Sequence, residues 1–355
     1  MTQNPASASS RFRTSAPALM EHSRDLCVPE LRKAVSRLAS PLDMVAAYHF
    51  GWSDRRGRPT TGGGKMLRPA LALLSAQAIG GKREAGVLGG VAVELVHNFS
   101  LLHDDFMDGD ELRRHRATAW TVFSPTLAIL TGDALLALAS DVLLNGSIHD
   151  TQLCDQARAV RRLTTASRRL IDGQARDLAF ERRAQISVQD CLDMEGAKTG
   201  ALLGCATAIG AVLASADDAT ADSLERYGHH LGLAFQAIDD LMGIWGDPKS
   251  TGKPRWSDLR RNKKSLPVCA ALTEGGTASR QLAELLASAH TGNEAEQELA
   301  QRAELIEAAG GRTWTQHEAR RQHEKALDSL GEVSMPDEVR EHFVTLAEFA
   351  VERER

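Results

Sequence analysis

Two acidic stretches decide the fold: HDDFMDGDELRR at residues 103–114 and FQAIDDLMGIWGD at residues 235–247, each preceded by apolar residues. Asp104 and Asp108 are four residues apart, so on a helix they share one face, roughly 6 Å apart along the axis. Carboxylates this close repel each other, but hard cations can bridge them. Mg²⁺ prefers a few carboxylate oxygens together with phosphate oxygens and waters. The two stretches therefore predict clusters that face each other across a helical bundle and hold a polyphosphate.

The composition is that of a globular protein, with 43% apolar and 25% charged residues in 355. Many Ala, Leu and Arg residues and few Tyr and Pro residues favour helix over sheet. The net charge of −5 argues against a nucleic-acid partner. The five cysteines are scattered without CxxC spacing, which suits a reducing cytoplasm.

Helical periodicity dominates, and no stretch shows convincing strand alternation. We expect one all-α domain at residues 21–355, a large helical bundle around a central active-site cavity, after a disordered tail at residues 1–20. The tail lacks acids like a transit peptide, but it has no clear amphipathic helix. No membrane span is expected, because Pro125 and Asp133 interrupt residues 119–144 and residues 200–216 are too few.

The helices are expected at 29–50 with a break at Pro41, and at 67–79, 83–107, 124–144, 151–182, 188–214, 219–245, 265–272, 280–290, 295–309, 313–330 and 336–352. Two charged loops, at residues 109–119 and 246–264, are expected at the same end of the bundle.

His97, Leu101, Asp104 and Asp108 recur at helical spacing and form one stripe. Upstream, GGGKMLRPAL at residues 62–71 places Lys65 and Arg68 after a glycine run and at a helix start. Glycines let the backbone approach an anion, and a helix start offers free N–H groups. Arg113 and Arg114 are further candidate phosphate clamps, since Arg binds phosphate with two hydrogen bonds. Taken alone, such basic residues are more often simply solvated.

The motifs together resemble the trans-isoprenyl diphosphate synthase (polyprenyl synthetase) family over about residues 30–350. They are GGKMLRP (63–69), LLHDDFMD (101–108), RRHRAT (113–118), GD (132–133), GQARDL (173–178), KTG (198–200), FQAIDD (235–240), GDPKSTGK (246–253), DL (258–259) and KKSLP (263–267).

The resemblance implies a head-to-tail condensation in which an allylic diphosphate (dimethylallyl, geranyl or farnesyl) ionises and isopentenyl diphosphate attacks the cation. Diphosphate departure separates a carbocation from a trianion, so the leaving group needs concentrated positive charge. By resemblance, three Mg²⁺ ions would bind the allylic diphosphate, two on Asp104 and Asp108 and one on Asp239. The other implied roles are allylic diphosphate clamps (Arg113, Lys198, Lys253, Lys263), isopentenyl diphosphate ligands (Lys65, Arg68, His97, Arg114) and oxygens beside the cation (Thr199, Gln236).

Phe99 and Ser100 lie five and four residues before the first Asp of the motif. A bulky residue followed by a small one at these positions resembles short-chain enzymes that stop at C20, because a ring blocks further growth of the product. We therefore expect geranylgeranyl diphosphate as the product, with farnesyl diphosphate as the second candidate. The resemblance also implies a homodimer.

The chain departs from the family at Gly243, where a third Asp is usual, and we expect Asp247 to compensate weakly. Two alternatives remain, a terpene cyclase and a non-catalytic regulatory subunit on the same fold. A cyclase needs no isopentenyl site, so Lys65, Arg68, His97 and Arg114 speak against it. Gln174 and Asp177 are either structural partners or substrate contacts, and only spacing separates Lys263 from Lys264.

Overall fold

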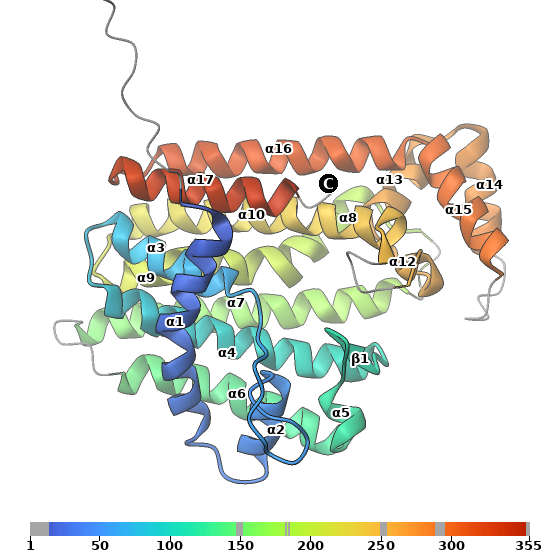
Figure 1. The fold of residues 1–355 in the computed structure, drawn as a ribbon. Helices are drawn as coiled ribbons and strands as arrows, with labels where there is room; N and C mark the ends of the chain where they lie inside the picture. The colour runs from blue at the N-terminus through green and yellow to red at the C-terminus, as the bar shows by residue number, and fades with distance from the viewer. Residues whose placement is uncertain are drawn as a thin grey trace, which may run out of the picture.

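The body of the molecule is a bundle of long helices that run side by side (Figure 1). A computed structural model describes residues 14–146, 152–181, 183, 185–248, 254–287 and 295–352. The long helices are α4 (Arg83–Met107), α6 (Pro125–Asn145), α7 (Leu153–Phe180), α9 (Ala201–Leu213), α10 (Asp218–Trp245) and α16 (Gly311–Gly331). Helix α10 packs against α9 and α16, and α4 packs against α6 and against α3 (Leu67–Ala78). The predicted all-α bundle is confirmed.

Shorter elements cover the ends and one side of this bundle. They are α1 (Ala16–Val35), α2 (Leu42–His49), β1 (Leu112–Arg113), β2 (Arg116–Ala117), α5 (Ala119–Val122), α8 (Val188–Glu195), the π-helix η1 (Gly196–Gly200), α12 (Ser257–Arg260), α13 (Leu266–Glu274), α14 (Gly276–Ala287), α15 (Glu296–Ala308) and α17 (Asp337–Val351). Helix α1 crosses the long helices, and β1 and α12 lie at one end of the bundle (Figure 1).

Local side-chain chemistry explains where several helices begin. At the start of α6, the Ser124 hydroxyl accepts a hydrogen bond from the N–H of Leu127 (3.1 Å), and Pro125 occupies the first helical turn. Proline is favoured there because its missing N–H has no partner within the helix anyway. Asp217 caps α10 in the same way, accepting from the N–H of Thr220 (2.7 Å). Polar caps thus fix the helix starts, and apolar faces fix the packing.

Three sequence expectations need correction. The tail ends earlier than residue 20, because α1 begins at Ala16 and buries Met20; residues 1–13 lie outside the described part. The charged loop at residues 109–119 contains a small antiparallel hairpin, with Leu112 opposite Ala117 and Arg113 opposite Arg116.

The third correction concerns apolar helices that are long enough to cross a membrane. By length and composition, Arg83–Met107, Pro125–Asn145 and Val188–Leu213 all qualify among the described residues. Pro125 does not interrupt its helix, because it stands at the helix start. Buried shares of 78% and 89% show that the first and third use their apolar residues inside the bundle, whereas Pro125–Asn145 is 44% buried.

Gly210 allows α9 to approach α3 closely. A Cβ at this position would clash with the backbone carbonyl of Ala72 and would lie 2.6 Å from Oγ of Ser75. That hydroxyl is fully buried, and it accepts a hydrogen bond from the N–H of Ala211 (3.2 Å). A side chain at residue 210 would therefore push the two helices apart.

We predict that Gly210→Ala lowers the free energy of unfolding by about 1–3 kcal/mol, because overpacking forces the backbones to shift. Gly331→Ala is the matched control: nothing lies within 4 Å of its added Cβ, so helix propensity should raise stability by up to about 1 kcal/mol. Urea denaturation of both variants measures the two changes. Equal changes would contradict the close approach of α3 and α9.

Candidate active site

The two predicted charged loops meet at one end of the bundle. The loop after α4 carries β1 and β2, the segment after α10 carries α12, and both lie at the same end (Figure 1). An ion pair between Asp110 and Arg261 joins the two segments directly. The π-helix η1 carries Lys198 and Thr199. Short π-helical turns are frequent at functional sites.

Asp104, on the last turns of α4, has a raised pKa. Burial is the largest cause and Asp108 adds to it, while Lys198 opposes them, and the pKa is about 6. The electrostatic influence of Lys198 shows that α4 and η1 lie near each other at this end. A bound divalent cation would favour the charged form of Asp104.

Asp105, which the sequence analysis did not single out, holds Arg113 in place. Arg113 Nε donates a hydrogen bond to Oδ1 of Asp105 (2.6 Å), and Asp105 is buried. Burial raises the pKa of Asp105, and Arg113 opposes that shift. Asp105 directly follows Asp104, a predicted metal ligand, and this adjacency in the sequence could have indicated its role.

A cavity of about 300 Å³ lies beside the first acidic cluster. Its walls come from the glycine-rich loop before α3, from α4 and from the β1–β2 hairpin, and they include His49, Asp105, Arg113, Arg114 and Arg116. Burial and then the three arginines lower the pKa of His49 to about 3. The cavity therefore has a positive potential that suits an anion.

Arg114 is the one of the four predicted isopentenyl diphosphate ligands that lines this cavity in the described part of the chain. Burial lowers the pKa of His97 well below its ordinary value, and Arg68 and Arg114 are the next largest causes, so these three side chains lie near one another. Lys65 Nζ lies 6.0 Å from the ring centroid of Phe349. The structure thus places Arg114 at the cavity and places Arg68 and His97 near Arg114.

Glu94 is a second functional candidate that the sequence analysis missed. It is buried, and Oε1 accepts a hydrogen bond from Nδ2 of Asn98 (3.1 Å). Burial raises the pKa of Glu94, whereas Arg68 and Arg114 oppose that shift. Glu94 lies three residues before His97 on the same helical stripe, which was the available signal. The charge of this buried acid therefore offsets part of the positive charge of the two guanidinium groups.

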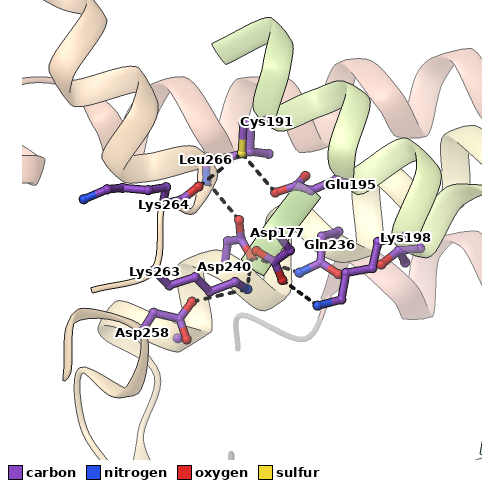
Figure 2. A network of polar contacts seen from close by, with 12 residues as sticks. Asp177, Cys191, Glu195, Lys198, Gln236, Asp240, Asp258, Lys263, Lys264 and Leu266 are labelled. Atoms are coloured by element: carbon purple, nitrogen blue, oxygen red, sulfur yellow. Dashed lines mark hydrogen bonds and ion pairs between the residues drawn. The ribbon is translucent and has the colours of Figure 1, made fainter. Parts of the chain in front are cut away.

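Asp240 is the centre of a polar network on α10 (Figure 2). Its side chain is 1% exposed. Oδ1 accepts a hydrogen bond from Gln236 Nε2 (2.9 Å) and pairs with Lys263 Nζ (3.5 Å), and Oδ2 accepts from the N–H of Leu266 (3.0 Å). Burial alone would raise the pKa of Asp240, but Lys263 and the hydrogen bonds lower it. Asp240 thus remains charged and fixes its neighbours.

Lys198 and Thr199 of η1 connect to α7 and α10. Lys198 Nζ lies 2.5 Å from Oδ2 of Asp177 (Figure 2). The Thr199 hydroxyl donates to Oε1 of Gln236 (2.9 Å). Asp177 is therefore a structural partner of Lys198. Gln174 is buried, and neither its amide nitrogen nor its oxygen has a hydrogen-bond partner among the described residues.

The structure separates Lys263 from Lys264. Lys263 reaches Asp240 and lies 3.9 Å from Oδ2 of Asp258, whereas Lys264 points the opposite way (Figure 2) and bonds Asn262 Oδ1 (3.4 Å). Burial would lower the pKa of Lys263, but the surrounding acids raise it well above its ordinary value. Lys263 is therefore a fixed positive charge at the site. Lys253 lies outside the described residues.

Gly243, where the family usually has Asp, leaves room for another carboxylate. A Cβ at Gly243 would clash with the carboxyl group of Asp258, lying 2.6 Å from Oδ1. The Ser257 hydroxyl donates to the carbonyl of Gly243 (3.3 Å), so α12 is tied to α10 at this point. Asp258 occupies the space beside Gly243, and Asp247 is exposed beyond α10, so compensation by Asp247 stays a prediction.

Phe99 and Ser100 are both buried on α4. The Phe99 ring meets the edge of His103, with centroids 4.9 Å apart, and His103 Nε2 lies 3.0 Å from the carbonyl of Ile129 on α6. The Ser100 hydroxyl donates to the carbonyl of His97 (2.8 Å). Neither residue lines the 300 Å³ cavity, so a role in product length remains a prediction.

The donor set suits magnesium that is shared with a diphosphate. Among the described residues, no three His, Cys, Asp or Glu side chains lie close enough to hold a metal ion by themselves. Mg²⁺ typically takes one or two carboxylates and fills its remaining positions with phosphate oxygens and waters. Asp104 and Asp108 stand one helical turn apart at the end of α4 and would supply such carboxylate oxygens.

Comparisons with known proteins agree with this geometry. The model of the family described as polyprenyl synthetase matches residues 57–305. The chain is 45% identical over 336 residues to the (2E,6E)-farnesyl diphosphate synthase of Mycobacterium tuberculosis H37Rv, covering 93% of this chain and 91% of that protein. It is 43% identical over 342 residues to a geranylgeranyl diphosphate synthase of the same organism, covering 95% and 94%.

Solved structures show the same fold. A polyprenyl synthetase from Streptomyces coelicolor A3(2) superposes with a TM-score of 0.89 at 61% identity, over 95% of this chain and 99% of that one. A geranylgeranyl pyrophosphate synthase from Corynebacterium glutamicum, complexed with isoprenyl diphosphate and magnesium, has a TM-score of 0.81 at 26% identity, over 96% and 100%. The chain belongs to the polyprenyl synthetase family and is a prenyltransferase.

Proposed function

We propose that the enzyme condenses isopentenyl diphosphate with an allylic diphosphate, head to tail, and makes geranylgeranyl diphosphate. The observation that carries the proposal is the juxtaposition of two acidic clusters around η1 with a separate basic cavity next to the first cluster. The acidic clusters suit a metal-bound allylic diphosphate, and the basic cavity suits a second diphosphate that needs no metal.

The allylic half of the site would hold the leaving diphosphate. Asp104, Asp108 and Asp239 would hold three Mg²⁺ ions, which when bound supply the positive charge that diphosphate departure requires. Lys198 and Lys263, fixed by Asp177 and Asp240, would add donors that need no rearrangement as charge develops.

The remaining allylic contacts come from Arg113 and from two side-chain oxygens. Arg113, oriented by Asp105, would be a further diphosphate clamp. The joined oxygens of Thr199 and Gln236 would flank the carbocation and stabilise it without forming a bond. We propose that the released diphosphate accepts the proton lost in the condensation.

The isopentenyl half would use Arg68, His97 and Arg114. The low pKa of His97, caused by burial and by the arginines, keeps its ring neutral, so it would donate one hydrogen bond rather than add charge. Lys65, which follows the glycine run before α3, would add a further positive charge to the same ligand. A basic anion site of this kind speaks against a terpene cyclase, which needs one diphosphate site only.

Product length is set by what stops the growing chain. The relatives include both a farnesyl and a geranylgeranyl diphosphate synthase at 45% and 43% identity, so overall similarity does not separate them. Phe99 favours C20, and farnesyl diphosphate is the second candidate. We also propose a homodimer, because Leu130 and Leu144 of α6 are apolar and about half exposed. The free cysteines favour a cytoplasmic location.

Purified protein with Mg²⁺, isopentenyl diphosphate and each allylic diphosphate tests the function, with chromatography of the product chain. A C20 product is expected. No product from any of the dimethylallyl, geranyl and farnesyl primers would favour a regulatory subunit. A hydrocarbon formed from geranylgeranyl diphosphate alone would identify a cyclase.

We predict that Asp104→Ala lowers turnover by several orders of magnitude while circular dichroism shows an intact fold. The substitution removes a ligand of the Mg²⁺ ions that would neutralise the departing diphosphate. Asp328→Ala, an exposed acid on α16, is the control and should leave turnover unchanged. A near-normal rate for Asp104→Ala would refute its role.

Phe99→Ala should lengthen the products, because it removes the ring that we propose blocks further growth of the product chain. Phe343→Ala on α17 removes an equally buried ring and controls for lost stability, which is about 3–5 kcal/mol for such a change. Both variants are assayed at low temperature by product chromatography. An unchanged product length in Phe99→Ala would show that another residue stops the growth of the chain.

Gly243→Ala and Gly243→Asp should both lower turnover, by about tenfold, because the new side chain displaces Asp258 from beside Lys263. Gly331→Ala controls for the general effect of a Gly replacement in a helix. Steady-state kinetics with saturating substrates provide the readout. A higher turnover of Gly243→Asp would contradict this prediction, because it would show that Asp258 does not replace the carboxylate that the family usually has at position 243.

A further inference from the structure

A second cavity, to which neither the motifs nor the proposed mechanism gives a role, lies against η1. It has a volume of about 540 Å³, and its walls come from α7, α8, η1, α10 and α16. It shares no lining residue with the 300 Å³ cavity beside the first acidic cluster. Small-molecule sites in proteins typically have volumes of about 300–1,000 Å³. The cavity is therefore large enough for a ligand of its own.

The bases on the walls of this second cavity are of two kinds. Arg321 Nε and Nη2 donate to the two carboxylate oxygens of the buried Glu318, at 2.7 Å each. The side chains of Arg169 and Arg176 on α7 and of Lys325 on α16 have no hydrogen-bond or ion-pair partner among the described residues. Three positive charges from two helices thus line the cavity without a paired acid.

The two acids on the same walls balance little of this charge. Asp172 pairs with Arg168, which does not line the cavity (3.2 Å), and Asp193 Oδ1 accepts a hydrogen bond from Nε2 of Gln189 (2.8 Å). Burial lowers the pKa of His229 to about 4, so its ring adds no charge at neutral pH. The cavity therefore has a positive potential that suits an anion.

The ring of His229, which also lines this cavity, packs against η1. A Cβ at Gly196 would lie 3.1 Å from Cε1 of His229, and a Cβ at Gly200 would lie 2.9 Å from the same atom. The ring fits there because neither glycine has a side chain. Lys198 and Thr199 lie between these glycines in the sequence. An anion in the cavity would therefore border the element that carries two residues of the proposed allylic site.

We propose that this second cavity binds an anion that carries a diphosphate group, at a site separate from both diphosphates of the reaction. Arginine suits such a group, because its planar guanidinium donates two hydrogen bonds to phosphate oxygens. A ligand that meets bases from both α7 and α16 needs several charged oxygens, which a diphosphate has and a single carboxylate lacks. The choice of diphosphate rests on the proposed function, in which each turnover consumes prenyl diphosphates and releases inorganic diphosphate. Both sources carry the group that the cavity would recognise.

Histidine-selective isotope labelling and NMR provide a reporter in each cavity, since His229 lines this one and His49 lines the 300 Å³ cavity. Inorganic diphosphate and geranyl diphosphate are titrated separately into the full-length protein without Mg²⁺, so that no turnover occurs. The variants His229→Gln and His49→Gln assign the two ring resonances. The His229 resonance of the wild type should shift until it saturates.

A matched pair of double variants tests whether the charges on the walls bind the anion. Arg169→Ala with Lys325→Ala should raise the midpoint concentration of the His229 shift by about tenfold or more, because charged hydrogen bonds to the ligand are lost. Arg161→Ala with Arg320→Ala removes the same charge from exposed positions of the same two helices outside the cavity. This control should keep the midpoint within about twofold of the wild type.

The midpoint of the His49 shift should be the same in all three proteins, which shows that the variants fold and keep the other cavity intact. A lower His229 midpoint with geranyl diphosphate would identify a prenyl diphosphate as the ligand, and an equal or higher one would identify inorganic diphosphate. The proposal is overturned if neither compound shifts the His229 resonance of the wild type, or if all three proteins give the same His229 midpoint. If the wild type makes no prenyl product, the proposed function fails, and the His229 titration still tests the cavity.

Discussion

Burying carboxylates at one end of an apolar helical bundle is possible only if each one meets a cation, a donor or a proton, because an isolated buried charge is very costly. Each buried acid of this site meets that requirement differently. Asp105 has Arg113, Asp177 has Lys198, and Asp240 has Lys263 with two further donors, Gln236 Nε2 and the N–H of Leu266. Burial raises the pKa of Asp104 to about 6 despite Lys198, and bound divalent ions would favour its charged form. The paired acids hold Arg113, Lys198 and Lys263 in position at this end of the bundle.

The same pairs connect helices that are distant in sequence. The Asp110–Arg261 pair links the loop after α4 to the segment after α10, and the Thr199–Gln236 bond links η1 to α10. The helices therefore cannot position the site unless they pack in register, and close approaches such as that at Gly210 set the register. Fold stability and catalytic geometry thus depend on the same contacts.

Most of the fold and the outline of the site could be predicted from the sequence. Helix periodicity and caps such as Ser124 depend on local sequence. Asp104 and Asp108 lie on the same face of their helix because of their spacing alone. The partners of buried acids could not be predicted in this way. Nothing local shows that Asp240 meets Lys263 or that Asp258 lies beside Gly243, because these contacts join segments that are apart in the sequence. Motif alone assigned Lys65 to the isopentenyl diphosphate, and that role stays a prediction.

The central claim is that the opposed acidic clusters bind one diphosphate through shared divalent ions. A crystal structure with Mg²⁺ and an unreactive allylic thiolodiphosphate tests it most directly. The account predicts that ions held by Asp104 and Asp108 and an ion held by Asp239 contact oxygens of the same diphosphate, with Lys198 and Lys263 on its other oxygens. A diphosphate bound without metal contacts to either cluster, or ions on only one of them, would contradict it.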